Sequence, residues 1–438
     1  MLARMDLSGD KDLGMLIEFL NKRNIGEDKE LTDRVAEIIR DVRLYGDEKL
    51  FYYTKLFDGI DLDKKNIKVS EGEIDAAYAR AAPAMLQTIR KACSNIREYH
   101  EKQKVEEYFI RRGKSTLLGQ LIRPLDTVGI YVPGGRAPLP SSVLMNAIPA
   151  RLAGVRKIVM ATPPKKEGVN DYVLIAAKEA GVDEIYTMGG AQAIAAMAYG
   201  TGSIPRVDKI TGPGNDYVAL AKKLVYGACD IDMIAGPSEI CIIADKDAKP
   251  DYIAADLLSQ AEHDPNAALF LITTEKCMMD KVDEALKEQL PGISRRDVAA
   301  EAISRNGLSI LAEDVDDAIR TADIIAPEHL ELMVVDGEKY LTKIKNAGAI
   351  FMGDHSPEPA GDYLAGTNHV LPTCGTARFS SPLGLRDFVK CISYIKYSRE
   401  DLGDDMEDIA RFAMCEGLDA HAASVRIRFG VKNDRKTC

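Results

Sequence analysis

The 438-residue sequence contains no tryptophan, only six histidines and no long apolar run. No window approaches the ~20 uninterrupted apolar residues that cross a bilayer, so the sequence predicts no membrane-spanning helix. Its first residues, Met1 to Asp10, include acidic side chains where a signal or transit peptide would be apolar or rich in arginine. These absences predict a cytoplasmic protein.

Paired thiols and excess positive charge are also missing. The eight cysteines are scattered and form no Cys-x-x-Cys pair. The sequence therefore indicates neither a disulfide framework nor a thiolate zinc cage, and buried reduced thiols are the simpler interpretation. A formal net charge of −11 disfavours non-specific attraction to nucleic acid or anionic membranes. The charge places no restriction on a small-molecule substrate.

The composition that is present, 46% apolar and 29% charged residues, is that of a globular protein, and the length suffices for about two or three domains. The pattern is helical up to about residue 105. Apolar residues such as Leu31, Val35 and Ile38 recur at helical spacing. The segment from Ser70 to Glu73 is a capping-box pattern that opens a long helix through the 80s and 90s. These helices are most simply scaffold.

From about residue 125, short apolar runs alternate with amphipathic helices. The predicted strands cover residues 128–132, 158–161, 184–187, 209–211, 240–244, 269–273 and 349–352. Helical segments at 142–153, 172–180 and 191–199 lie between the first four. Strands separated by helices at this interval predict an α/β fold with a parallel sheet, and the later strands predict a second α/β unit. From Asp387 onward, a strand-like run and two helices, 401–415 and 418–429, predict a separate C-terminal piece.

Glycine-rich loops follow several of these strands, as in nucleotide-binding sheets. They occur at 132–135, 189–192 and 211–215, and the last leads into a predicted helix over 216–226. Yet the run from Gly212 to Tyr217 lacks the third glycine of the G-x-G-x-x-G fingerprint, and no acidic ribose-binding residue can be assigned. Taken alone, the loops are more simply explained as ordinary turn glycines. The motifs alone therefore do not establish a dinucleotide site.

Gln260 and His263 form a candidate ligand pair. They lie three residues apart in the last turn of a helix that begins near Pro250, so both side chains share one face. Pro265 should end this helix and leave the pair at a loop edge. An amide oxygen and an imidazole at this spacing can bind one cation, although a capped helix end is the alternative. Glu262 lies off this face.

Three further polar clusters accompany this pair, and together the four segments contain four of the six histidines. The clusters are Glu328-His329, Asp362 with His369, and Glu416 with His421. Each alone would more often be structural, but their joint occurrence favours a site. Imidazole, carboxylate and amide ligands without thiolate suit Zn²⁺, with Mn²⁺, Co²⁺ or Fe²⁺ as alternatives. The absence of His-Glu-x-x-His disfavours a gluzincin-type peptidase.

The same segments resemble the histidinol dehydrogenase family. The runs that carry the resemblance are 259–264, 327–332, 361–372 and 416–421, with shorter matches at Tyr131–Gly135, Gly212–Asn215 and Ala235–Glu239. They occur in the family's order from about residue 120 to 425. The resemblance implies oxidation of L-histidinol to L-histidine through L-histidinaldehyde, with two NAD⁺ reduced per turnover. This reaction is the end of histidine biosynthesis.

The resemblance also implies a role for individual residues. One Zn²⁺ per subunit would be held by Gln260, His263, Asp362 and His421. His329 would be the general base and Glu328 the group that activates water. The substrate-binding residues would be Ser238, Gln260, His263, His329, Asp362, His369, Glu416 and His421. The NAD site would be lined by Tyr131, Gln192 and Asn215.

The implied fold is two incomplete Rossmann-like α/β domains with parallel sheets, in an intertwined homodimer whose active site is shared between subunits. The expected division is an N-terminal helical segment at 1–26, a first α/β domain at 27–130 and 239–381, a second at 131–238, and a C-terminal segment at 382–438. The first domain would carry the metal and catalytic residues and the second the NAD-binding loops. His421 and Glu416 would then reach the site from the partner subunit.

Other reaction classes remain open at this point. A metal-dependent hydrolase acting on a small polar substrate would need the metal and the Glu328/His329 pair but no nicotinamide site. An aldehyde-dehydrogenase-like enzyme would need a nucleophilic cysteine, and no cysteine here has that setting. A non-catalytic metal scaffold would leave Glu328 and His329 without a purpose. Zinc could serve as Lewis acid or template; the template role is favoured because histidinol has its own imidazole and amine ligands.

Overall fold

The computed structural model describes residues 1–8, 13–21, 29–134, 138–234 and 236–431. Two positions of the motifs above, Gly135 and Ala235, lie outside the described residues. The chain divides into one unit formed by residues 1–104 and 125–388 and a second formed by 105–124 and 389–438. Among the described helices, none has the length and apolar character to span a bilayer.

The first unit contains a six-stranded, fully parallel sheet with the strand order β1-β11-β10-β9-β12-β13. Its strands are β1 (Ala3–Asp6), β9 (Glu239–Ala244), β10 (Ala268–Thr273), β11 (Gly307–Leu311), β12 (His329–Met333) and β13 (Ala349–Met352). Both β9 and β10 are buried at every residue. Continuous burial of this kind is typical of parallel strands that are covered on both faces.

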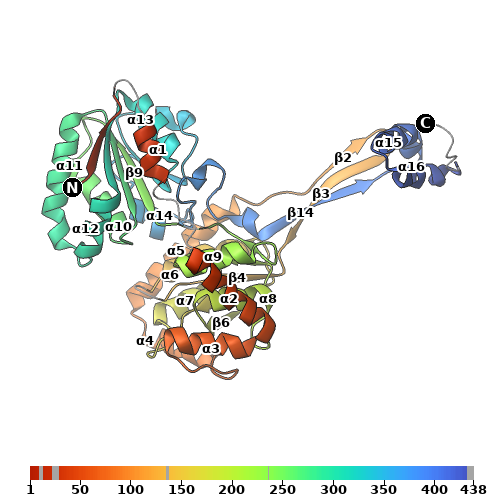
Figure 1. Cartoon of the computed structure of the whole chain (residues 1–438), viewed down its shortest axis with the longest axis horizontal. Coiled ribbons are helices and arrows are strands. Elements are labelled where there is room, and N and C mark those ends of the chain that lie inside the picture. Colours follow the sequence, from red (N-terminus) through yellow and green to blue (C-terminus); the bar gives the residue numbers. More distant parts are fainter. Residues whose placement is uncertain (9–12, 22–28, 135–137, 235, 432–438) are drawn as a thin grey trace. The chain divides into compact units, whose positions relative to one another are not determined.

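Helices cover both faces of this sheet, as Figure 1 shows. One face packs on α10 (Pro250–Ala261), α11 (Lys276–Gln289) and α12 (Arg296–Asn306). The other packs on α1 (Leu13–Asn21) and α13 (Val315–Ile325). The short helix α14 (Glu358–Tyr363) follows β13. Two separate apolar clusters thus hold the sheet between its helical layers.

The same unit contains a second parallel sheet, of five strands, in the order β6-β5-β4-β7-β8. Its strands are β4 (Thr127–Tyr131), β5 (Lys157–Thr162), β6 (Glu184–Thr187), β7 (Lys209–Thr211) and β8 (Asp230–Ile231). One face packs on α4 (Glu71–Arg80), α5 (Pro83–Glu101), α6 (Pro140–Leu152) and α7 (Asp171–Ala180). The other packs on α2 (Lys29–Tyr45), α3 (Asp47–Asp58), α8 (Gly190–Tyr199) and α9 (Asp216–Val225).

Both sheets share the doubly wound strand order. In chain order the five-stranded sheet is arranged 3-2-1-4-5, which is the Rossmann order without its sixth strand. The run β11-β10-β9-β12-β13 repeats that order in the larger sheet, and β1 adds to its edge. The predicted fold class, α/β with two incomplete Rossmann-like parallel sheets, is therefore confirmed. The predicted strands all occur close to their predicted positions, while β1, β8, β11 and β12 of these two sheets were missed.

The packing differs from the predicted division in two places. Residues 27–130 were assigned to the domain of 239–381, but helices α2 to α5 pack on the five-stranded sheet. The cause is their apolar stripes: Val35 and Ile38 of α2 share a core cluster with Ile194 and Val218 of the helices behind that sheet. The N-terminal segment was expected to be helical only, and its first element is strand β1, which pairs with β11.

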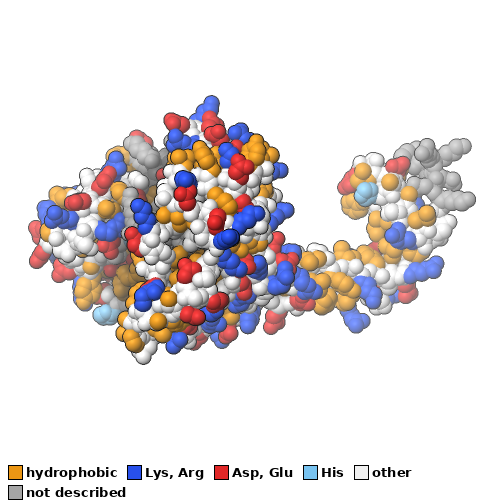
Figure 2. Space-filling view, turned by 90° about the horizontal axis from the view of Figure 1, so that it is seen from below, with side chains coloured by type: hydrophobic (Ala, Val, Ile, Leu, Met, Phe, Trp, Pro, Cys, Tyr) orange, Lys and Arg blue, Asp and Glu red, His pale blue; other side chains and the backbone are white. Residues whose placement is uncertain are grey.

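The second unit is a three-stranded antiparallel sheet with two helices. Strand β3 (Thr116–Pro124) lies between β14 (Val389–Lys396) and β2 (Tyr108–Arg112), and α15 (Arg399–Cys415) and α16 (Asp419–Arg426) follow. This pairing explains why residues 105–124 join the C-terminal segment, which was predicted to start at 382 without them. Figure 2 shows apolar side chains on the surface of this unit. The exposed ones include Tyr108, Ile110, Ile392, Ile395 and Phe412.

Candidate functional site

A pocket of the first unit lies between the edges of its two sheets and encloses about 170 Å³. The six-stranded half contributes the predicted residues Ser238, Gln260, His263, Glu328, His329, Asp362 and His369. The five-stranded half contributes Ser142, Gly212, Pro213, Asp232 and Met233. The fold therefore brings seven of the predicted site residues into one cavity.

The polarity of the strands determines which residues meet. His329 begins β12 and pairs with Ile240 of the adjacent β9, so Glu328 and Glu239 lie side by side at the amino ends of these strands. Gly212, in contrast, follows the carboxyl end of β7 in the other sheet. Doubly wound sheets bind nucleotides at carboxyl ends, beside the switch point between their first and fourth strands. Here that point lies between β4 and β7.

Glu239 organises the acid–base pair mainly through its backbone. Its N–H donates to the Glu328 carboxylate (2.8 Å), and its carbonyl oxygen lies 2.9 Å from Nδ1 of His329. Because a carbonyl can only accept, Nδ1 carries the proton and Nε2 keeps its lone pair. The Glu239 side chain in turn accepts from the Cys374 amide (3.0 Å). One buried residue thus fixes two candidate catalytic side chains and an adjoining loop.

His329 has the properties of a general base. Its Nε2 is buried and finds no hydrogen-bond partner among the described residues. Burial, followed by the nearby His263 and His369, lowers the pKa of His329 to about 3, so the imidazole is neutral at pH 7. The carboxylates of Glu358 and Asp362 lie 3.8 and 3.9 Å from Nε2, where they would stabilise the imidazolium formed on proton uptake.

Glu328 is a carboxyl group placed beside this base. Its Oε2 lies 3.6 Å from Nδ1 of His329, and the side chain is 7% exposed. Burial, with the neighbouring Asp362 and Glu358 carboxylates, raises the pKa of Glu328 well above its usual value. A carboxylate with a raised pKa is a stronger base than usual, and such a group can take a proton from water.

A cation site adjoins the pair. His263, Glu358 and Asp362 each offer a ligand atom, and these atoms all lie within 4.8 Å of one another. Burial, followed by repulsion from Asp362, raises the pKa of Glu358 to about 8. Such repulsion is expected where acidic groups have gathered without the positive charge that they are arranged to hold.

Gln260 adds a fourth potential ligand. Its side chain is 1% exposed, and its amide Oε1 finds no hydrogen-bond partner among the described residues. Burying a hydrogen-bond acceptor costs free energy of folding unless a donor or a cation binds to it. Amide, imidazole and carboxylate donors without thiolate fit Zn²⁺. The residues present therefore fit a zinc ion, with Gln260, His263 and Asp362 as predicted ligands from this chain.

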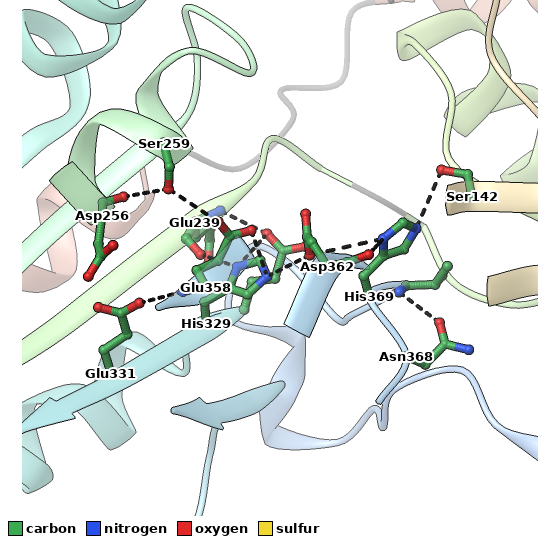
Figure 3. Close-up of polar contacts among 12 residues, drawn as sticks. Ser142, Glu239, Asp256, Ser259, His329, Glu331, Glu358, Asp362, Asn368 and His369 are labelled. Atoms are coloured by element: carbon green, nitrogen blue, oxygen red, sulfur yellow. Dashed lines mark hydrogen bonds and ion pairs between the residues drawn. The ribbon is translucent and has the colours of Figure 1, made fainter. Parts of the chain in front are cut away.

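Sequence reasoning missed Glu358. It lies four residues before Asp362 on α14, so the two carboxylates share one helical face, and this i, i+4 spacing could have revealed it. A layer of polar side chains supports it, as Figure 3 shows. Ser259 donates to Oε2 of Glu358 (3.2 Å), and the backbone N–H of Glu358 donates to the Glu331 carboxylate (2.9 Å). Burial, followed by the nearby Asp256 carboxylate, raises the pKa of Glu331 to about 9. This buried layer anchors the amino end of the helix that carries Asp362.

His369 lies on the far side of Asp362 from His329. Its Nδ1 is 3.1 Å from the carbonyl oxygen of Asp362, and its Nε2 is 3.4 Å from Oγ of Ser142 (Figure 3). Burial lowers the pKa of His369 to about 4, so this imidazole is also neutral at pH 7. Its place on the pocket wall agrees with a contact to substrate, which stays a prediction.

The predicted cofactor residues lie at the carboxyl edge of the five-stranded sheet. Tyr131 ends β4, and its hydroxyl accepts from the Gly190 amide (3.1 Å). Gln192, in the first turn of α8, is 1% exposed, and neither atom of its amide finds a partner among the described residues. Asn215 caps α9 by accepting from the Val218 amide (3.2 Å). An unsatisfied buried amide beside two helix amino termini fits a dinucleotide.

Glu416 and His421 belong to the second unit. Glu416 follows α15, His421 lies on α16, and both side chains are exposed. The described residues that line the pocket of the first unit lie within 139–373, and Glu416 and His421 are not among them. Their predicted roles, as a metal ligand and a substrate contact, stay predictions.

Two doubly wound parallel sheets, with the buried Glu328/His329 pair and the Gly212 loop at one pocket, are features of an α/β enzyme of the dehydrogenase class. Comparison with known proteins gives the family. A family model described as histidinol dehydrogenase matches residues 21–429. The chain belongs to this family, and it is an oxidoreductase of histidine biosynthesis.

Individual members of the family match this chain over nearly its whole length. The histidinol dehydrogenase of Heliobacterium mobile is 52% identical over 94% of this chain and 96% of its own. That of Caldanaerobacter subterraneus is 50% identical over 98% of this chain and 99% of its own. The crystal structure of histidinol dehydrogenase from Elizabethkingia anophelis superposes with a TM-score of 0.92 at 37% identity, covering 98% of both chains.

The ligand assignment predicts how single substitutions affect the metal. Gln260→Ala should weaken zinc binding at least about tenfold, because it removes a buried donor that has no other partner in the described structure. Competition with a chromogenic chelator measures the change. Glu262→Ala is the matched control, since Glu262 is two residues away and outside the pocket lining. Equal zinc affinity in the two variants would contradict the assignment.

Proposed function

We propose that the protein oxidises L-histidinol to L-histidine through L-histidinaldehyde, reducing two NAD⁺ and using one zinc ion per subunit. The observation that carries the proposal is that His329 and the cation site open into the same pocket as the Gly212 loop. A substrate carbon beside Nε2 of His329 can therefore face a nicotinamide bound at the carboxyl edge of the five-stranded sheet. A metal-dependent hydrolase would need the Glu328/His329 pair and the metal, but it would not need a nucleotide-binding edge of the five-stranded sheet.

In the first oxidation, His329 takes the hydroxyl proton through Nε2 while hydride leaves the same carbon for the nicotinamide. The hydrogen bond from Nδ1 to Glu239 keeps the lone pair on Nε2, so the base needs no tautomer change before it acts. The positive charge that the ring gains lies within 4 Å of the Glu358 and Asp362 carboxylates. Those carboxylates lower the cost of forming a buried imidazolium.

In the second oxidation, Glu328 takes a proton from the water that adds to the aldehyde. The gem-diol anion left by this proton transfer loses hydride to a second NAD⁺ and becomes the carboxylic acid. Glu328 and His329 lie next to each other at the start of β12, so both steps can occur on a substrate held in one place. Zinc, when bound, would supply a template for the substrate's imidazole and amine groups, or a Lewis acid.

We further propose a homodimer in which Glu416 and His421 of one subunit complete the site of the other. Support comes from the second unit, where Ile395 is 68%, Phe412 75% and Ile427 72% exposed. Large apolar side chains exposed together mark surfaces that another protein covers. The partner would be a second copy of this chain. We also propose that the protein is located in the cytoplasm.

Product stoichiometry tests the reaction. Zinc-loaded protein should form two NADH for each histidine, and chelation should abolish the reaction until zinc is restored. Glu328→Gln keeps the volume of the side chain but removes the base for hydration, so this variant should release histidinaldehyde and form about one NADH per histidinol consumed. Absorbance at the NADH band and chromatography of the products give the ratio. One NADH per histidine in the unmodified protein would contradict the proposal.

Subunit mixing tests the shared site. His263→Ala and His421→Ala chains should each be inactive as homodimers. After unfolding and refolding together, half of the dimers are mixed, and each mixed dimer has one intact site, so about a quarter of the activity should return. The control is refolding of each variant by itself. If the mixture recovers no activity although mixed dimers form, the site is not shared.

A further inference from the structure

A buried ion pair lies behind the Gly212 loop and serves neither the acid–base pair nor the cation site. Lys222, on α9, contacts Asp232, the residue that follows β8, and their side chains are 2% and 1% exposed. Removing two charges from water is costly, and replacing a buried pair by apolar residues is often neutral or stabilising. Stability alone therefore does not account for a charged pair at this position.

The pair holds one residue of the loop from both sides. Nζ of Lys222 donates to the Gly212 carbonyl oxygen (2.9 Å), and Oδ2 of Asp232 accepts from the Gly212 N–H (2.8 Å). Gly212 has φ +113°, and a Cβ there would collide with the carbonyl oxygen of Tyr131 at the end of β4. Both backbone groups of Gly212 are thus used, in a conformation that glycine alone adopts readily.

This residue is where the loop crosses the nucleotide edge of the sheet. Gly212 follows β7, next to β4, and the loop passes through Pro213 and Gly214 into Asn215, the cap of α9. Lys222 lies on that same helix, so it ties the helix to the loop that precedes it. The direction of the first amides of α9, where a pyrophosphate would bind, depends on this tie.

Asp232 also connects the loop to the substrate side. Its Oδ1 accepts from the Met233 amide (2.6 Å), and Gly212, Asp232 and Met233 all line the same pocket as His329. The carboxylate therefore fixes two pieces of pocket wall relative to each other. Charge-assisted hydrogen bonds are shorter and stronger than neutral ones, and they suit this task of holding backbone in one geometry.

We propose that Lys222 and Asp232 are positioning residues for the cofactor: their ion pair holds Gly212 in the geometry that binds the pyrophosphate of NAD. The inference rests on the proposed function, because it takes the carboxyl edge of the five-stranded sheet as the NAD site. Neither side chain needs to touch NAD; each acts through the backbone of Gly212.

The test measures equilibrium NADH binding by nicotinamide fluorescence, on full-length zinc-loaded protein without substrate. Lys222→Met removes the cation and keeps most of the side-chain volume. It should weaken NADH binding about tenfold or more, because a charge-assisted hydrogen bond to the loop is lost. Zinc affinity should not change, since neither residue belongs to the cation site. Asp232→Asn should also weaken NADH binding. This second variant tests the proposal if Lys222→Met does not fold.

Lys209→Met is the matched control. Lys209, on β7, is a second buried lysine, with a side chain 7% exposed. Its partners are Asp230 (2.9 Å) and Asp387 (3.8 Å) rather than the glycine loop. This variant should lose thermal stability without losing NADH affinity. Equal weakening in Lys209→Met and Lys222→Met, or unchanged NADH binding in both Lys222→Met and Asp232→Asn, would overturn the proposal. A wild-type protein that binds no NADH would instead overturn the proposed function, and this inference with it.

Discussion

The site depends on the backbone of one residue, Glu239. Its N–H and carbonyl oxygen hold the Glu328 carboxylate and Nδ1 of His329 at the amino end of β9. This arrangement is possible because β9 and β12 are adjacent and parallel, so the residues that begin them lie side by side. Backbone groups inside a sheet cannot move independently of the sheet. The acid–base pair is therefore oriented by the most rigid part of the fold rather than by a loop.

The two sheets contribute opposite ends to the pocket. The six-stranded sheet supplies the amino ends of β9 and β12, with the base and the cation ligands, and the five-stranded sheet supplies the carboxyl end of β7, with the glycine loop. One sheet alone would provide either the proton chemistry or the dinucleotide edge. Duplication of the 3-2-1-4-5 strand order thus gives two halves with different tasks.

The local parts of the site could be predicted from the sequence. The three-residue spacing of Gln260 and His263, and the adjacency of Glu328 and His329, are visible in the sequence as short-range patterns. Glu239, Lys222 and Asp232 could not be found in this way, because they act through contacts of 89, 10 and 20 residues' separation with backbone groups that carry no side-chain signature. The predicted assignment of helices α2 to α5 to the domain of the six-stranded sheet was wrong for the same reason. An apolar stripe indicates that a helix face is buried, but it does not specify which sheet covers that face.

The proposed chemistry requires His329 to be a neutral base with its proton on Nδ1 and its lone pair on Nε2. Nitrogen-15 NMR of protein labelled at histidine measures this directly, because protonated and unprotonated ring nitrogens resonate far apart and His329→Gln identifies the signal. At pH 7 the zinc-loaded protein should show a protonated Nδ1 and an unprotonated Nε2 for His329. A ring protonated on both nitrogens, or on Nε2 alone, would contradict the account.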